Sequence, residues 1–215
     1  MLCCAMPTDR ITIVAYSDYV CPWCYIALER ADRLRRLFPV DVQWRPFELH
    51  PETPRDGARL AGRLGSRTRA AAYAQNIVDL ARDSGITLRM PEVVANSHLA
   101  LEAAEFAREH GDFDAYHRSL FAAYFEHGRN LGDPDALCDI ARNAGLDDQG
   151  MRQALSDGHY AELIDRITAA AREDEVISTP TFIFSGGFRL TGAQDYNVFE
   201  SVTSRLLAKK ARDGI

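Results

Sequence analysis

A pair of cysteines separated by two residues lies between a strand-like segment and a helical one, and this placement constrains the fold most. Ile11–Tyr16 is β-branched and aromatic, as in a buried strand. The segment that begins with Cys21 is helical in character to about Phe38. In Val40–Arg45, apolar and polar residues then alternate, as they do in a strand. Strand, helix and strand in this order predict a βαβ unit with a parallel strand pair.

Composition indicates a globular protein. The 215 residues are 47% hydrophobic and 26% charged, with a net charge of −6, enough apolar sequence for a sizeable core. We expect no nucleic-acid partner, because such binders present a basic face, and no membrane span, because no apolar run approaches the required length. Five arginines occur at short spacing, and we interpret them as one solvated helix face: Arg55, Arg59, Arg63, Arg67 and Arg69.

The cellular compartment decides whether the five cysteines should form disulfides or stay as free thiols. The first six residues lack the apolar core of a secretory signal, so we expect a cytoplasmic protein with reduced thiols. Cys3 and Cys4 fall in an expected flexible tail, residues 1–9, and are taken as incidental. Cys138 stands in an apolar helical stretch and is expected to be a small core residue. Cys21 and Cys24 remain as the candidates for chemistry.

The rest of the chain predicts a helical insertion. Residues 57–172 are expected to form a helical domain, because a structureless loop of that length is implausible. The flanking segments 10–56 and 173–212 are expected to form one α/β domain, with the order βαβ…ββα. The expected closing elements are the strand Pro180–Phe184, the strand Phe188–Thr191 and a helix over Val198–Arg212.

The cysteine pair favours redox chemistry. A thiol at a helix N-terminus meets unpaired N–H groups and a partial positive charge, which stabilise the thiolate. Cys21 would be the nucleophile, and Cys24, one turn further, would resolve the mixed disulfide. Pro22 suits the first helical turn, and with Trp23 it stiffens the active-site loop.

Metal binding by the cysteines is disfavoured. A structural zinc site usually needs a second cysteine pair or closely spaced histidines, and the sequence has neither. His110 and His117 are seven residues apart and are interpreted as solvated or core residues. We therefore expect no metal site and no bound cofactor.

These motifs together resemble the DsbA-like oxidoreductases, and specifically the FrnE-type branch. The resemblance runs over roughly residues 10 to 212. It is carried by the following segments: Ser17–Tyr25, Arg45–Pro51, Asn96–His98, Thr179–Phe182 and Gly192–Gln194.

The resemblance implies a thioredoxin-like fold with a large helical insertion domain, a homodimer, and oxidoreductase or disulfide-isomerase activity on a disulfide-containing peptide or a small thiol, with glutathione as a candidate redox partner. It also implies that Pro180 is cis and faces the cysteine pair, with Thr179 beside it as a substrate-binding residue. Some FrnE-type members carry a second C-terminal cysteine pair, which this chain lacks. The family likeness places four further residues near the cleft: Phe47, His50, Asn96 and His98.

Two other function classes stay open. The same fold branch contains kappa-class glutathione transferases and 2-hydroxychromene-2-carboxylate isomerases, which bind glutathione and typically have serine at the position of Cys21. Retention of both Cys21 and Cys24 favours electron exchange over that chemistry. The third class is a peptide-binding module or chaperone, which predicts an ordinary thiol pKa near 8.5 for Cys21.

Overall fold

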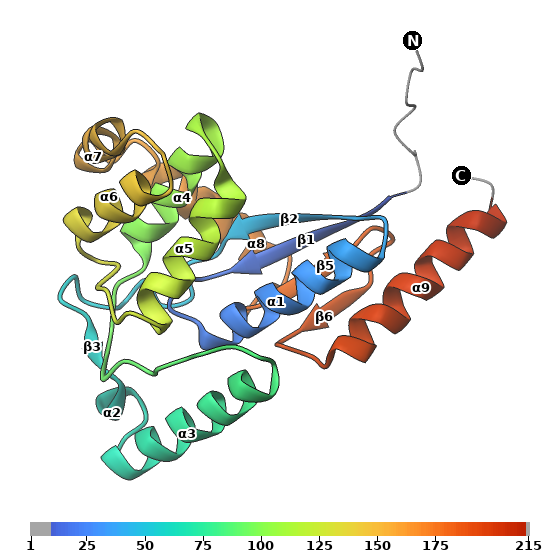
Figure 1. Cartoon of the computed structure of the whole chain (residues 1–215), viewed down its shortest axis with the longest axis horizontal. Coiled ribbons are helices and arrows are strands. Elements are labelled where there is room, and N and C mark those ends of the chain that lie inside the picture. The colour runs from blue at the N-terminus through green and yellow to red at the C-terminus, as the bar shows by residue number, and fades with distance from the viewer. Residues whose placement is uncertain (1–9, 214–215) are drawn as a thin grey trace.

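A four-stranded sheet forms the centre of the computed structural model, which describes residues 10–213 (Figure 1). The sheet has the order β2-β1-β5-β6. Strand β1 pairs in parallel with β2, whereas β1–β5 and β5–β6 are antiparallel. The predicted βαβ unit and C-terminal hairpin are thus confirmed, whereas Cys3 and Cys4 lie outside the described residues. The strands are β1 Ile11–Ser17, β2 Val40–Pro46, β5 Thr181–Phe184 and β6 Arg189–Thr191.

Helices cover both faces of this sheet. Helices α1 (Pro22–Leu37) and α9 (Tyr196–Asp213) lie together in front of it in the view of Figure 1, and α8 (Ala161–Glu173) lies behind it. Alternate residues of β1, such as Ile13, are buried in the main core. Tyr16, on the other face of the strand, packs in a smaller cluster with residues of α8. The period-two alternation of the strand therefore divides its side chains between two helical layers.

The region between β2 and β5 is mostly helical, as predicted, but it also contains a two-stranded ladder. Strands β3 (Ala58–Arg59) and β4 (Val93–Val94) pair antiparallel. The sequence analysis, which expected a helical domain here, did not predict them. Each strand has only two residues, too few for a detectable alternation. The remaining helices are α2 Leu60–Arg63, α3 Arg67–Asp83, α4 His98–His110, α5 Phe113–Phe125, α6 Pro134–Asn143 and α7 Asp148–Ser156.

The five arginines do not share one helix face, so that interpretation was wrong. Arg59 is in β3, Arg63 ends α2, and Arg67 begins α3. Two glycines interrupt the segment in the left-handed region, Gly57 with φ +83° and Gly65 with φ +78°. Because only glycine adopts this conformation without strain, each marks a chain reversal that a continuous helix could not contain.

One buried cluster extends from the sheet into the helical region. It includes Ile13 and Trp44 from the strands and Phe121 and Cys138 from α5 and α6. The prediction that Cys138 is a core residue is confirmed, since its side chain is buried, and Trp44 of β2 is buried as well. The helical region is therefore packed against the sheet through apolar side chains.

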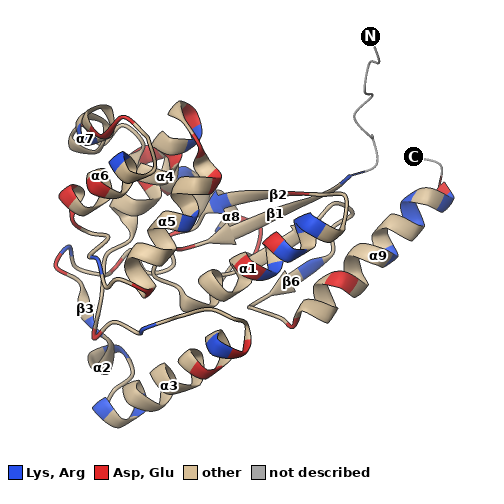
Figure 2. Cartoon of the chain, in the orientation of Figure 1, with Lys and Arg blue, Asp and Glu red and all other residues tan. Residues whose placement is uncertain are grey.

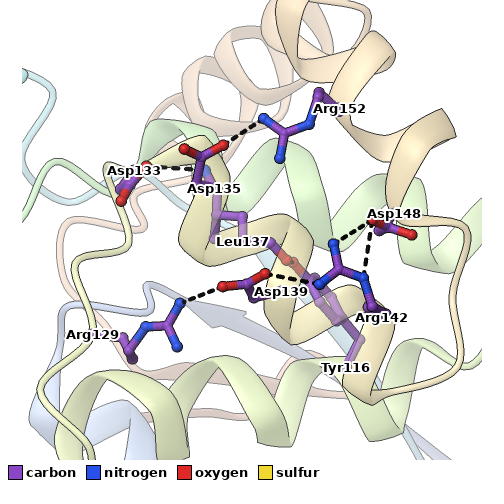
Figure 3. A network of polar contacts seen from close by, with 9 residues as sticks. All are labelled: Tyr116, Arg129, Asp133, Asp135, Leu137, Asp139, Arg142, Asp148 and Arg152. Carbon is purple, nitrogen blue, oxygen red and sulfur yellow. Dashed lines mark hydrogen bonds and ion pairs between the residues drawn. The ribbon is translucent and has the colours of Figure 1, made fainter.

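Surface polar contacts connect the outer helices. Arg142 of α6 bridges Asp139 on its own helix and Asp148 of α7, and Arg129 reaches Asp139 from the preceding loop (Figure 3). Asp133 is the N-cap residue of α6, and its side chain accepts from the Asp135 N–H at 2.9 Å. Figure 2 shows acidic and basic residues interspersed along the helices. Such exposed pairs contribute little stability individually.

Candidate active site

The cysteine pair lies where the chain passes from the C-terminal end of β1, an inner strand of the sheet, into helix α1. After Ser17 the chain turns through a short loop, and Cys21 is the N-cap residue of α1 with extended backbone angles. Pro22 occupies the first helical turn, as predicted. No side chain caps this helix, Pro22 has no N–H, and the Cys24 N–H donates to the Cys21 carbonyl at 3.0 Å. The positive end of the helix dipole therefore points at Cys21, where it stabilises an anion.

Two opposing effects set the acidity of Cys21. Burial raises the pKa of a thiol, but the hydrogen-bonding environment that Cys24 and Thr179 provide outweighs it and leaves the pKa of Cys21 below its ordinary value. Cys21 Sγ also lies 3.5 Å from the Thr179 carbonyl oxygen. The hydrogen bonds that lower the pKa favour the thiolate that the redox interpretation requires, whereas the Thr179 carbonyl accepts only from the protonated thiol.

Cys24 has the opposite character. Its side chain is fully buried. Burial, together with the neighbouring Cys21, raises its pKa well above the ordinary thiol value. The two sulfurs are unbonded in this structure. The asymmetry makes Cys21 the more readily ionised thiol, suited to attack, and leaves a protonated Cys24 thiol behind it.

The segment before β5 lies opposite the cysteines. The Thr179–Pro180 peptide bond is cis, as the resemblance implied, and the Thr179 carbonyl is the group that contacts Cys21. Pro180 uses its own carbonyl to accept the Gly192 N–H at 2.8 Å, which holds this segment to the end of β6. The sequence-distant residues Cys21 and Thr179 are therefore brought together.

Asp18 is a buried ionisable residue of the site that the sequence analysis missed. Its side chain accepts from the Leu49 N–H at 2.8 Å and from the Val20 N–H at 3.2 Å. Burial raises the pKa of this carboxyl despite these hydrogen bonds, and its charge in turn acts to raise the pKa of Cys21. The signal in the sequence was an acid placed between a buried strand and the cysteine pair.

Tyr19 joins the cysteine loop to the helical region. Its hydroxyl lies 2.7 Å from Nδ1 of His117 on α5, and both side chains are buried. His117 is surrounded by aromatic rings, including those of Trp44 and Phe113. Burial and nearby arginines place the pKa of His117 well below its ordinary value, so it is neutral and fills a core position, one of the two placements predicted for it.

A cleft of about 440 Å³ opens beside Cys21. Trp23 is half-buried at its wall, which fits the predicted cleft-rim position, and His50 also lines it. Much of the opposite wall comes from the helical region, which sequence reasoning did not assign to the site: Leu60, Arg63, Leu64, Tyr73, Met90 and Val94. The cleft therefore lies between the α/β region and the helical region.

The other three residues expected near the cleft do not line it. Phe47 is buried on the far face of the sheet against Tyr16. Asn96, one residue before the N-cap residue Ser97, accepts the His98 N–H of α4 at 3.0 Å. His98 pairs with Glu48, 2.9 Å away. The structure thus brings only His50 of the four to the cysteine pair.

Sheet order, the cysteine pair at the start of α1 and the facing cis-proline define a protein of the thioredoxin-like class. The chain matches the family described as "DSBA-like thioredoxin domain" over residues 12–203, and it belongs to that family. Among the described residues, no helix has the length and apolar character needed to cross a membrane.

Several known proteins are similar to this chain over most of its length. The uncharacterised protein YwbO of Bacillus subtilis is 29% identical over 203 residues, 93% of this chain and 99% of that protein. A probable DsbA oxidoreductase from Streptomyces coelicolor has 25% identity and a TM-score of 0.84, covering 91% of this chain and 89% of its own. A 2-hydroxychromene-2-carboxylate isomerase shares the fold, with 21% identity, a TM-score of 0.76, and coverage of 94% and 98%.

Proposed function

We propose that this protein is a thiol–disulfide oxidoreductase that acts through Cys21 and Cys24. The observation that carries the proposal is the asymmetry of the pair: the pKa of Cys21 is lowered at the cleft, whereas the pKa of the buried Cys24 is raised. Membership of the DsbA-like family supports the same class of chemistry.

The reaction starts with attack by the Cys21 thiolate on a substrate disulfide. A mixed disulfide forms on Cys21, and the first substrate sulfur leaves as a thiolate, which takes up the proton of Cys24. The Cys24 sulfur then attacks Cys21 Sγ, releases the second substrate thiolate and leaves a Cys21–Cys24 disulfide. Two electrons pass to the substrate, and the reverse sequence oxidises a substrate dithiol.

The cleft supports a disulfide in a peptide or in a small thiol as the substrate. Apolar residues such as Trp23, Leu49 and Met90 line it, and His50 and Arg63 add polar groups. The Thr179 carbonyl beside Cys21 offers an acceptor to an extended peptide. Glutathione would serve as a redox partner, since it is a small thiol with charged ends.

Reduction of insulin disulfides with dithiothreitol as electron donor tests the proposal. Cys21→Ser should reduce the catalysed rate to background, because the attacking sulfur is lost, and Cys24→Ser should trap mixed disulfides on Cys21. Cys138→Ala is the matched control, because this third thiol is buried in the core away from the cleft. Wild-type activity in Cys21→Ser would overturn the mechanism.

A glutathione-dependent isomerase or transferase is the second candidate, favoured by the shared fold with the 2-hydroxychromene-2-carboxylate isomerase and by a cleft of small-molecule size. The oxidoreductase needs Cys24 to resolve the mixed disulfide, whereas a glutathione-dependent isomerase or transferase does not. If calorimetry detects glutathione binding and glutathione-dependent turnover survives Cys24→Ser, the second candidate replaces the first.

We also propose a homodimer, which the family resemblance implies, and a cytoplasmic location, which suits cysteines that stay reduced. Light scattering on the purified chain checks the first, and fractionation of cells that make the protein checks the second. A monomer at micromolar concentration would contradict the dimer.

A further inference from the structure

We propose that Glu48, His98 and Asp165 bind one divalent transition-metal ion, with Glu102 on the second nitrogen of the His98 ring. The three ligand groups come from three separate elements: the loop after β2, helix α4 and helix α8. Their ligand atoms all lie within 4.8 Å of one another. The site is separate from the proposed redox function, because none of its residues lines the cysteine cleft.

The geometry around His98 matches a metal-bound imidazole. Its Nδ1 lies 2.9 Å from Oε2 of Glu48, and its Nε2 lies 3.7 Å from Oε1 of Glu102, one helical turn along α4. Histidines that bind metals usually donate their other ring N–H to a carboxylate, which fixes the ring and increases its basicity. Glu102 lies at ion-pair distance from that nitrogen, and a small movement of its side chain would bring it within hydrogen-bond range of the N–H. Nδ1 then faces Glu48 and the metal.

The local charge also favours a cation. Within residues 10–213, His98 is the only ion-pair partner of Glu48 and of Glu102, and Asp165 has none. Glu102 is 2% exposed, and its Oε2 has no hydrogen-bond partner in this part of the chain. Burying a carboxylate with one oxygen left without a hydrogen bond, near two other carboxylates, is costly. A divalent ion beside the imidazole would offset most of the charge of the three carboxylates.

The backbone around Glu48 is already held in place. The Glu48 N–H donates to Oγ1 of Thr168 on α8 at 3.1 Å, and Arg172 donates to the Glu48 carbonyl at 3.0 Å. The next residue, Leu49, donates its N–H to the buried carboxylate of Asp18. An ion bound here would therefore crosslink α4 and α8 to the segment that supports the cysteine loop.

The donor set selects the class of ion. One imidazole with two carboxylates suits Zn²⁺ or Mn²⁺, because imidazole favours zinc-like metals and carboxylates favour manganese-like ones. Protein ligands would fill three positions, and water would complete the shell. Zn²⁺ also binds thiolates such as Cys21, whereas Mn²⁺ prefers oxygen ligands, so Mn²⁺ is the clean probe.

The experiment is a Mn²⁺ titration of the full chain, followed by loss of the electron paramagnetic resonance signal of free Mn²⁺. We expect one ion per chain, a rise in Tm on addition of Mn²⁺, and at least about tenfold weaker binding in Asp165→Asn, because loss of a ligand costs no less than loss of its supporting shell. Glu173→Gln, which removes an exposed carboxylate from the same helix, should bind as the wild type does.

Asp165 is exposed, so Asp165→Asn is expected to fold, and its circular dichroism and Tm without metal verify this. His98→Asn provides the second variant and should also bind at least about tenfold more weakly. Absence of Mn²⁺ binding by the wild type at millimolar concentration would overturn the proposal. Equal affinities of Asp165→Asn and Glu173→Gln would overturn it as well.

Discussion

Protonation of His117 should destabilise the fold in acid, and His117→Asn should remove this effect. The imidazole is buried against Tyr19 and aromatic rings, and burial, reinforced by Arg108, Arg118 and Arg35, holds its pKa well below the ordinary value. The unfolded chain therefore binds a proton at pH values where the folded chain does not. This contribution to stability is complete above the unfolded pKa and is lost as pH falls below it.

The magnitude follows from one proton. With an unfolded pKa of about 6.5 and a folded pKa well below it, lowering the pH from about 7.5 to about 5.5 removes about 1.4 kcal/mol of unfolding free energy. This corresponds to a decrease in Tm of about 3–6 °C for a chain of this size. His117→Asn keeps an acceptor for the Tyr19 hydroxyl but does not titrate, so its own cost is the same at both pH values.

Urea unfolding of both proteins at the two pH values measures the difference. Other groups with shifted pKa values, such as His98, whose pKa is raised by Glu48, are present in both proteins and cancel. We expect the wild type to lose about 1.4 kcal/mol more than His117→Asn on acidification. Equal losses would refute the assignment of a neutral, buried His117.

Three further predictions concern other parts of the chain. Cys24→Ala should raise the pKa of Cys21, because the Cys24 thiol lowers that pKa through a hydrogen bond and so opposes the effect of burial. Ultraviolet titration of the thiolate measures the pKa, and an unchanged value would contradict the prediction. Arg118→Ala should cost about 1–3 kcal/mol in urea unfolding, because it leaves the buried Asp32 without its bidentate partner on α5. Gly57→Ala should cost at least about 1–2 kcal/mol, because φ is +83° and the new Cβ would lie 2.7 Å from a carbonyl oxygen of β4; wild-type Tm in that variant would contradict the strain.

Local patterns predicted most of the fold. The alternation of β1 and β2, the cap and proline at the start of α6, and the two cysteines at the start of α1 are all short-range features. Such features depend on neighbouring residues, so they can be recognised in the sequence. The β3–β4 ladder was missed because strands of two residues are too short to show an alternation of apolar and polar side chains.

The sequence by itself determined where the cysteine pair lies, after a strand and at the start of a helix, because both elements are encoded by neighbouring residues. Only the tertiary structure decided which distant groups complete the environment. Thr179 at Cys21, His117 at Tyr19, and Asp165 at Glu48 and His98 are contacts between residues far apart in sequence. Burial and charge at these positions depend on packing between elements, which no local pattern of residues contains.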